Sequence, residues 1–370
     1  MLIKNAKVFI GRSFVKADVE FDKAIIAVGS LPGEGDIDAK GAYLLPGFVD
    51  IHTHGAMGED FSDGIMAGMQ TMADYYAAHG VTSYLATTMT LKEEVLTPAM
   101  NVIRDFKRNG GAKCAGVHLE GPFLGYAKRG AQAAENLHAP DKALFDRLNA
   151  ESGNQVRLVT VACEEEGAMD FISHVSKVAA VSLGHTSCNY DQAMEAFGRG
   201  ASHATHLFNG MDGLHHRTPG IVAAAMDADA SVELICDGLH IHPAVIRLVH
   251  RLYGTKLNLI SDSLRCAGMP DGDYMLGGQP ITMKDGKATL TGSNTLAGSS
   301  ISMLDAVRNV VSFGLPLADA VYCASTAPAD AVGLGNIGRI AAGCAADLLL
   351  LDENLELKAV FVDGEEQKIK

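Results

Sequence analysis

The feature that most constrains the fold is an alternation of short apolar runs with amphipathic segments between about residues 46 and 335. Apolar runs of this length are typical of buried parallel strands, and the segments between them have the spacing of surface helices. Eight such βα units over roughly 250 residues correspond to an α/β fold of the TIM-like (β/α)8 barrel type. The alternative is an open doubly wound sheet with its site at one crevice. The expected strands are 48–52, 83–87, 115–120, 157–161, 180–184, 201–206, 232–237 and 257–262, and the clearest helices are 64–79, 93–108, 141–150, 189–197 and 243–253.

The two ends of the chain follow a different pattern. Residues 1–45 and 338–370 contain short strand-like stretches separated by turn residues and no helical periodicity. Each end is too short to fold alone. We therefore expect both ends to build one small β-sandwich domain beside a catalytic barrel domain of residues 46–337.

Charge and cysteine usage exclude several classes of partner. The formal net charge of −14 argues against nucleic acid and against anionic membrane surfaces. The seven cysteines are scattered and form no CxxC pair, which indicates reduced thiols in a cytoplasmic protein. The opening apolar stretch is too short for a signal peptide, and no run reaches the roughly 18 apolar residues of a membrane span.

Ionisable residues gather where the expected strands end. His52 and His54 are two positions apart, so on a strand their side chains point to the same face. Polar groups at the ends of buried barrel strands cost several kcal/mol unless they are satisfied, and chemistry in a barrel gathers at these carboxyl ends. The other strand-end residues of this kind are Glu120, His185, His206, Asp237 with His240, and Asp262.

This donor set, imidazole nitrogen and carboxylate oxygen without cysteine, suits Zn²⁺, Fe²⁺, Mn²⁺ or Co²⁺. Such an ion polarises a carbonyl and lowers the pKa of bound water. Asp262 supplies a carboxylate able to take a proton from that water and return it to a leaving group. The predicted reaction class is metal-assisted hydrolysis, most simply of an amide.

The same residues resemble those of the amidohydrolase superfamily and, within it, the family of N-acetylglucosamine-6-phosphate deacetylases. The resemblance covers essentially the whole chain. It implies a cytoplasmic, metal-dependent enzyme that hydrolyses the N-acetyl amide of N-acetylglucosamine 6-phosphate to glucosamine 6-phosphate and acetate in amino-sugar catabolism. The segments that carry it are PGFVDIHTHG, HLEGPF at 118–123, GHT at 184–186, THLFNGM at 205–211, DGLHIHP at 237–243, ISDSL at 260–264 and NTLAGSS at 294–300.

The resemblance also implies roles for individual residues. Asp262 would transfer protons and His240 would polarise the acetyl carbonyl. One or two divalent transition-metal ions per subunit would be held by Glu120, His185 and His206, with His52 and His54 serving the second ion. The phosphorylated amino sugar would be bound by Ala131, Gln132, Asn209, Gly210, Arg217, His240, Leu296, Ala297 and Gly298.

Some implications depart from the family pattern or leave alternatives open. Many relatives carry His where this chain has Gln132, so we assign Gln132 to substrate binding without an acid–base role. Arg217 matches an arginine that reaches the neighbouring site of a homodimer. His118 and His203 are interpreted as supporting residues. The remaining alternatives are an N-acetylgalactosamine-6-phosphate deacetylase and a non-enzymatic scaffold with this fold, although such scaffolds usually lose metal ligands.

Overall fold

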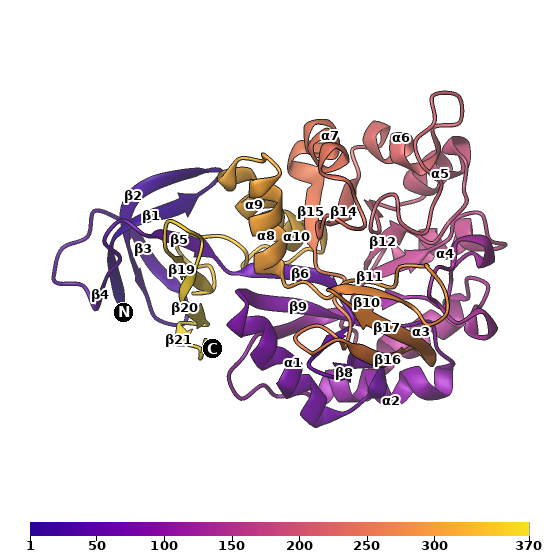
Figure 1. Ribbon diagram of the computed structural model, residues 1–370, viewed down its shortest axis with the longest axis horizontal. Helices are drawn as coiled ribbons and strands as arrows, with labels where there is room; N and C mark the ends of the chain where they lie inside the picture. The colour runs from indigo at the N-terminus through magenta and orange to yellow at the C-terminus, as the bar shows by residue number, and fades with distance from the viewer. Residues whose placement is uncertain (370) are drawn as a thin grey trace.

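A nearly closed barrel of eight parallel strands forms the larger part of the molecule (Figure 1). The computed structural model describes residues 1–369. Each strand pairs with its neighbour in chain order, so the (β/α)8 fold is confirmed and the open doubly wound sheet is excluded. The barrel strands are β6 (Phe48–Thr53), β9 (Val81–Thr88), β10 (Lys113–Glu120), β11 (Val156–Val161), β12 (Ala180–Leu183), β13 (His203–Ala204), β14 (Ser231–Ile235) and β15 (Leu257–Ile260).

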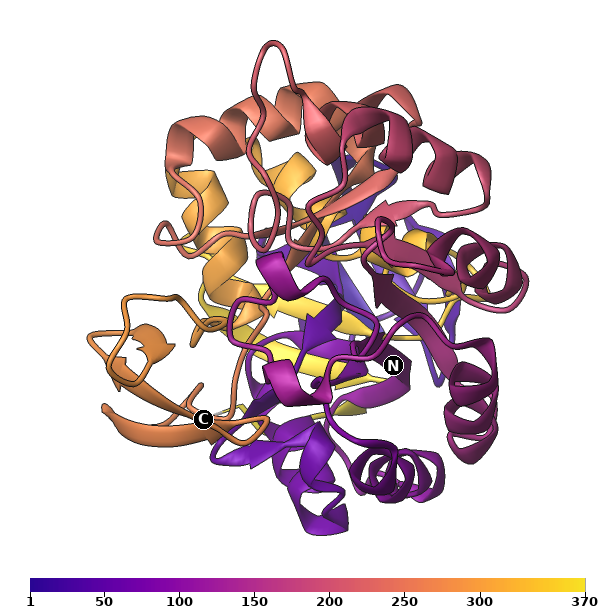
Figure 2. The ribbon, with the colours of Figure 1, turned by 90° about the vertical axis from the view of Figure 1, so that its right-hand side faces the viewer.

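Helices surround the barrel strands, as the view in Figure 2 shows. The five helices expected from the sequence are present within a few residues of their predicted limits, and five further α-helices occur among residues 1–369. The first group comprises α1 (Met66–Ala78), α2 (Glu93–Asp105), α3 (Lys142–Glu151), α5 (Tyr190–Gly198) and α7 (Pro243–Tyr253). The second comprises α4 (Ala168–Val175), α6 (Gly220–Asp227), α8 (Met303–Ser312), α9 (Leu317–Ala324) and α10 (Thr326–Ala331).

The seam between the first and last barrel strands is closed by a side chain. The fully buried Asp50 of β6 accepts hydrogen bonds from Ser261 Oγ at 2.5 Å and from Ser261 N at 3.3 Å, just past the end of β15. The amide of Asp262 also donates to the carbonyl of His52 at 2.9 Å. These bonds hold the site residues of both strands at one edge of the barrel.

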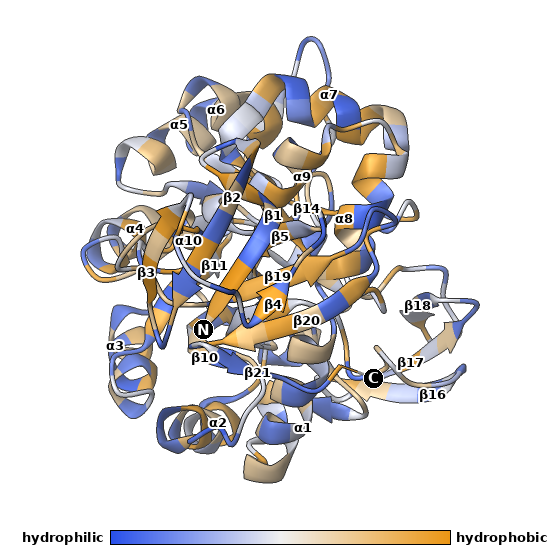
Figure 3. Ribbon diagram, turned by 90° about the vertical axis from the view of Figure 1, so that its left-hand side faces the viewer, coloured by the Kyte–Doolittle hydropathy of each residue, from blue (hydrophilic) through white to orange (hydrophobic). Residues whose placement is uncertain are grey.

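A second sheet of eight strands combines both ends of the chain, as expected for the small β-sandwich domain. Its junction is β5 against β19, which run antiparallel, and hydrophobic residues dominate β19 and β20 (Figure 3). We propose that the domain limits lie near residues 45 and 338, as the sequence suggests. The strands are β1 (Leu2–Ile10), β2 (Ser13–Phe21), β3 (Ile25–Gly29), β4 (Ile37–Asp38), β5 (Tyr43–Pro46), β19 (Leu348–Leu351), β20 (Leu357–Val362) and β21 (Glu365–Glu366).

Two features differ from the sequence-based expectation. The sixth barrel strand was expected over 201–206 but contains only His203–Ala204, because the chain turns out of the strand at His206. A three-stranded antiparallel sheet, β16 (Gly272–Leu276), β17 (Gln279–Lys284) and β18 (Lys287–Leu290), follows the last barrel strand and was not predicted. It is the orange segment at the lower left of Figure 2. Within residues 1–369, no helix has both the length and the apolar character needed to cross a membrane.

Candidate metal centre and active site

A buried carboxylate, Glu120, lies at the centre of the polar residues at the carboxyl ends of the strands. It is the last residue of β10 and is 2% exposed. Its Oε1 lies 3.2 Å from Nε2 of His185 and 3.0 Å from Nε2 of His206, and these two nitrogens are 3.1 Å apart. Three electron-pair donors from the ends of β10, β12 and β13 therefore meet in one small volume.

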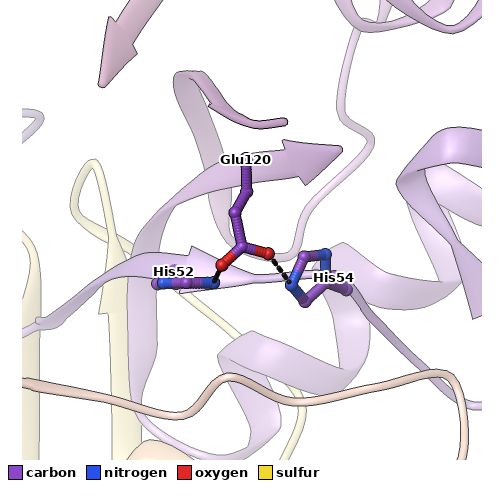
Figure 4. Close-up of side chains that lie close together, drawn as sticks. All are labelled: His52, His54 and Glu120. Carbon is purple, nitrogen blue, oxygen red and sulfur yellow. Dashed lines mark ion pairs between the residues drawn. The ribbon is translucent and has the colours of Figure 1, made fainter. Parts of the chain in front are cut away.

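His52 of β6 and His54, just beyond the end of this strand, approach the same carboxylate from another side. His54 Nε2 lies 3.1 Å from Glu120 Oε2, and His52 Nε2 lies 3.4 Å from Glu120 Oε1 (Figure 4). Asp262 Oδ1 is 3.6 Å from His52 Nε2 and 3.4 Å from His54 Nε2. Both imidazoles thus point toward the same pair of carboxylates, which agrees with their spacing of two residues on a strand.

Three of these residues share an uncommon backbone conformation. The φ angles are 48° at His185, 27° at His206 and 48° at Asp262, in or near the left-handed region that costs a non-glycine residue of order 1–3 kcal/mol. Each of the three lies two positions beyond the last residue of its strand, β12, β13 or β15. The same backbone kink just after three strands ends each strand early and turns the side chain toward Glu120.

The charges around Glu120 favour a cation. Burial alone would protonate Glu120, but His52, His185 and the other histidines outweigh it and hold the pKa of this carboxyl well below its usual range. Burial also disfavours a charged His54, yet Asp262 and Glu120 raise the pKa of His54 to about 9. Buried carboxylates thus draw positive charge into this volume, and without an ion only protonated imidazole supplies it.

The donor set also fits a metal by its spacing. Two ligands of a tetrahedral ion with bonds near 2.05 Å lie about 3.3 Å apart, close to the 3.0–3.2 Å among Glu120, His185 and His206. Nε2 of His52 is buried and makes no hydrogen bond to any residue of the range 1–369. Two groups that share Glu120 are able to hold an ion here, namely Glu120 with His185 and His206, and Glu120 with His52 and His54; a third group of this kind, His52 with His118 and Glu233, does not include Glu120.

A pocket of about 170 Å³ opens above these ligands. Its wall includes Leu276 of β16, in the sheet that was not predicted, and residues 295–298, which follow that sheet. Arg217, in contrast, is exposed on the loop before α6 and does not line this pocket. The predicted residues that line it are His54, Glu120, Ala131, Gln132, His185, His206, Asn209, Gly210, His240, Asp262, Leu296, Ala297 and Gly298.

Two glycines allow the pocket walls to pack closely. A Cβ at Gly298 would lie 2.7 Å from the carbonyl oxygen of Asp262, and φ there is 41°. A Cβ at Gly210 would lie 2.9 Å from Nδ1 of His185, with φ at 59°. Both distances are shorter than real Cβ contacts, so these positions require glycine to hold the loops against the strand-end residues.

His240 is oriented by a neighbouring carboxylate. Asp237 Oδ2 lies 2.7 Å from His240 Nδ1, and Asp237 Oδ1 accepts the backbone N–H groups of Leu239 and His240 at 2.8 Å each. Burial opposes the charge on Asp237, but the contact with His240 outweighs it and lowers the pKa of Asp237. With Nδ1 held in this way, Nε2 is the nitrogen of His240 available to the pocket.

Sequence reasoning did not single out Glu233, a fully buried residue of β14. Its carboxylate contacts His52 and His203 and lies beside the ligands of the centre. A charged residue within the apolar run VELIC was the available signal, because buried parallel strands rarely carry charges. His118 packs against the site: its ring lies 4.5 Å from that of His52, and burial together with His52 lowers the pKa of His118 to about 3.

Residues 43–367 match the model of the amidohydrolase family. The chain belongs to the amidohydrolase family. This family is metal-dependent, and the cluster around Glu120 supplies a group of side chains able to hold an ion.

Two curated amidohydrolase relatives illustrate the degree of similarity. An N-acetylglucosamine-6-phosphate deacetylase of Vibrio furnissii is 34% identical over 355 residues, which cover 94% of this chain and 89% of the relative. An N-acetylgalactosamine-6-phosphate deacetylase of Escherichia coli O157:H7 is 36% identical over 351 residues, which cover 93% of this chain and 92% of that relative.

A mutant N-acetyl-D-glucosamine-6-phosphate deacetylase from Mycobacterium smegmatis, solved in complex with N-acetyl-D-glucosamine-6-phosphate, superimposes with a TM-score of 0.94 at 33% identity. The match covers 100% of this chain and 99% of the other. The similarity therefore extends over both the barrel and the small sheet.

Proposed function

We infer that this amidohydrolase is a metal-dependent N-acetylglucosamine-6-phosphate deacetylase, which releases acetate and leaves glucosamine 6-phosphate. The observation that carries the inference is the position of Glu120 Oε1, within 3.2 Å of Nε2 of both His185 and His206 at a pocket also lined by Asp262 and His240. The relatives with this activity supply the substrate class.

The ligands divide into two sets that share Glu120. Glu120, His185 and His206 would hold a divalent transition metal at the primary position, one of Zn²⁺, Fe²⁺, Mn²⁺ or Co²⁺. Glu120 with His54 and His52 would hold a second ion, so one or two ions would be bound per subunit. A bound ion polarises the acetyl carbonyl and makes water a stronger nucleophile at neutral pH.

The remaining chemistry belongs to side chains of the pocket. Asp262 accepts a proton from the attacking water, a C–O bond forms at the acetyl carbon, and Asp262 returns the proton to the sugar nitrogen as the C–N bond breaks. His240 directs Nε2 toward the acetyl oxygen, where a donor stabilises the charge that develops in the transition state. The products from one amide and one water are acetate and the protonated sugar amine.

The sugar phosphate is held by the loops around the pocket. Asn209 and Gly210 bind the phosphate, and Ala131 and Gln132 contact the sugar from the loop after β10. The apolar run Leu296–Ala297–Gly298 lines the sugar face, where the left-handed Gly298 brings the backbone close. Arg217 is exposed in one chain, and in a homodimer it reaches the phosphate in the neighbouring site, where its fork can bind two oxygens.

Localisation in the cytoplasm is part of the same proposal. All seven cysteines are unpaired in the structure, and five of them are buried. Reduced thiols are the norm in a reducing compartment.

Acetate release by the purified protein tests the function. N-acetylglucosamine 6-phosphate, N-acetylgalactosamine 6-phosphate and unphosphorylated N-acetylglucosamine are compared, before and after chelation and after add-back of each of the four metals. We expect the fastest release from N-acetylglucosamine 6-phosphate, loss on chelation and recovery on add-back. Faster release from the galactosamine substrate would favour the alternative deacetylase, and no release by metal-loaded protein would reject the function.

A further inference from the structure

One buried carboxylate, that of Glu233, contacts both of the metal-ligand groups that share Glu120. Glu233 Oε2 lies 2.9 Å from Nδ1 of His52 and 3.1 Å from the backbone N of His206. Its other oxygen, Oε1, lies 3.1 Å from Nε2 of His203. Glu233 thus contacts a side chain of one ligand group and the backbone of the other.

Packing alone does not account for a charge at this position. Glu233 is 0% exposed and lies between the apolar residues Val232 and Leu234 of β14. A buried carboxylate costs several kcal/mol unless it is paired and hydrogen-bonded, and leucine would fill the same space. Glu233 is satisfied by three contacts, and two of them reach metal-ligand residues.

The contact with His52 decides which of its nitrogens can bind an ion. A carboxylate oxygen accepts hydrogen bonds, so the proton of neutral His52 resides on Nδ1. Nε2 then keeps its lone pair, and this atom lies 3.4 Å from Glu120 Oε1 and 3.6 Å from Asp262 Oδ1. Outer carboxylates of this kind raise the basicity of a ligating imidazole and fix its orientation.

We propose that Glu233 is a positioning residue that fixes the Nδ1–H tautomer of His52 and thereby sets the affinity of the second ion position, formed by His52, His54 and Glu120. This proposal depends on the proposed function in one respect, which is that these residues are metal ligands. The effect acts through His52, so Glu233 itself touches neither ion nor substrate.

The test measures metal binding and tautomer state in the full-length protein. Zn²⁺ per subunit is determined by elemental analysis after dialysis against a series of free Zn²⁺ concentrations. The ¹⁵N shifts of the His52 ring report which nitrogen carries the proton. Glu233→Gln retains the shape and Glu233→Leu removes every acceptor. We expect the second ion to bind about 10-fold more weakly in the first variant and 100-fold more weakly in the second, with the first ion retained.

Two further variants separate positioning from general stability. His203→Gln changes the other partner of Glu233 while leaving the contact with His52, and should keep both ions. His52→Asn removes the ligand itself, so adding Glu233→Gln to it should weaken binding no further. A merely structural role would instead give additive losses in the double variant and a loss in His203→Gln.

The proposal would be overturned if Glu233→Gln and Glu233→Leu left both the affinity for the second ion and the His52 Nδ1–H signal unchanged. It would also be overturned if the wild-type protein held a single ion at saturating Zn²⁺. These readouts involve no substrate. A protein that binds both ions but releases no acetate would therefore reject the proposed function and leave this inference standing.

Discussion

The side-chain amide of Gln132 donates a hydrogen bond to Glu120 Oε2 at 2.9 Å, while Gln132 Oε1 accepts the backbone N–H of Thr90 at 2.9 Å. The residue expected only to bind substrate therefore also fixes the orientation of the central carboxylate. Its amide is held from both ends, which leaves little freedom for rotation about the last side-chain bond.

Replacing Gln132 by Leu should lower kcat/KM about 10- to 100-fold, because a hydrogen bond to a charged group contributes about 1.5–3 kcal/mol. The loss should accompany weaker metal retention, measured by elemental analysis. Gln132→His is the matched control, since an imidazole N–H can still donate to Glu120, and it should keep most of the activity. Equal losses in the two variants would show that the donor to Glu120 is unimportant.

Asp262→Asn should reduce kcat by about 10²- to 10⁴-fold, the usual contribution of a positioned proton-transfer group. Metal content should stay near that of the wild type because Glu120, His185 and His206 remain. Acetate release and elemental analysis are measured on the same preparation. Asp227→Asn, at an exposed carboxylate of α6, should behave as wild type. Near-normal turnover of Asp262→Asn would remove this residue from the mechanism.

Arg217→Ala should raise KM for the phosphorylated substrate at least 10-fold while leaving the slow reaction of the unphosphorylated sugar unchanged, because only the phosphate needs the guanidinium. Arg199→Ala, at another exposed arginine, is the control. Mixing Arg217→Ala with Asp262→Asn subunits tests the dimer: one of the two sites then has both native residues, and activity should recover. No recovery in confirmed mixed dimers would mean that Arg217 serves its own subunit.

Asp50→Ala should lower the free energy of unfolding by about 3 kcal/mol, because it leaves buried donors of Ser261 and His52 without an acceptor. Burial raises the pKa of Asp50 to about 7, although its hydrogen bonds act in the opposite direction. Urea unfolding measures the change. The exposed Asp74→Ala on α1 should cost under about 0.5 kcal/mol. An Asp50 variant as stable as this control would mean that the seam does not depend on the side chain.

Asp363→Asn should lower stability at pH 7 by about 1 kcal/mol, a value reduced for solvent screening at this partly exposed site. Asp363 joins the small sheet to the barrel through Lys113 at 2.7 Å and Arg108 at 2.5 Å. Burial opposes its charge, but Lys113 and Arg108 outweigh burial and lower the pKa of Asp363.

Because the folded-state pKa of Asp363 is depressed, its contribution is complete above the unfolded value near 3.9 and is lost as the pH falls through the folded value. Urea unfolding at pH 7, 5 and 3 should therefore show the wild type and Asp363→Asn converging at the acidic end. A constant difference between them across this range would contradict the prediction.

Much of the barrel could be predicted because its strands are short apolar runs bounded by polar strand ends, a local pattern. Such a pattern fixes neither the length of β13 nor the position of β16–β18. The first depends on a backbone kink at His206. The second depends on packing between distant segments, because the buried face of this sheet, which includes Leu276 and Ile281, lies against residues such as Met89.

The sequence by itself determined the fold class, the donor types and the positions of Glu120, His185, His206 and Asp262 at strand ends, because periodicity and residue chemistry are local properties. Only the tertiary structure decided which atoms face each other. His52 and Glu233 are 181 residues apart, and no pattern along the chain specifies that Nδ1 of one meets Oε2 of the other. Closure of the barrel brings the side chains of β6 and β14 together in its interior, and the resulting contact leaves Nε2 of His52 free for an ion.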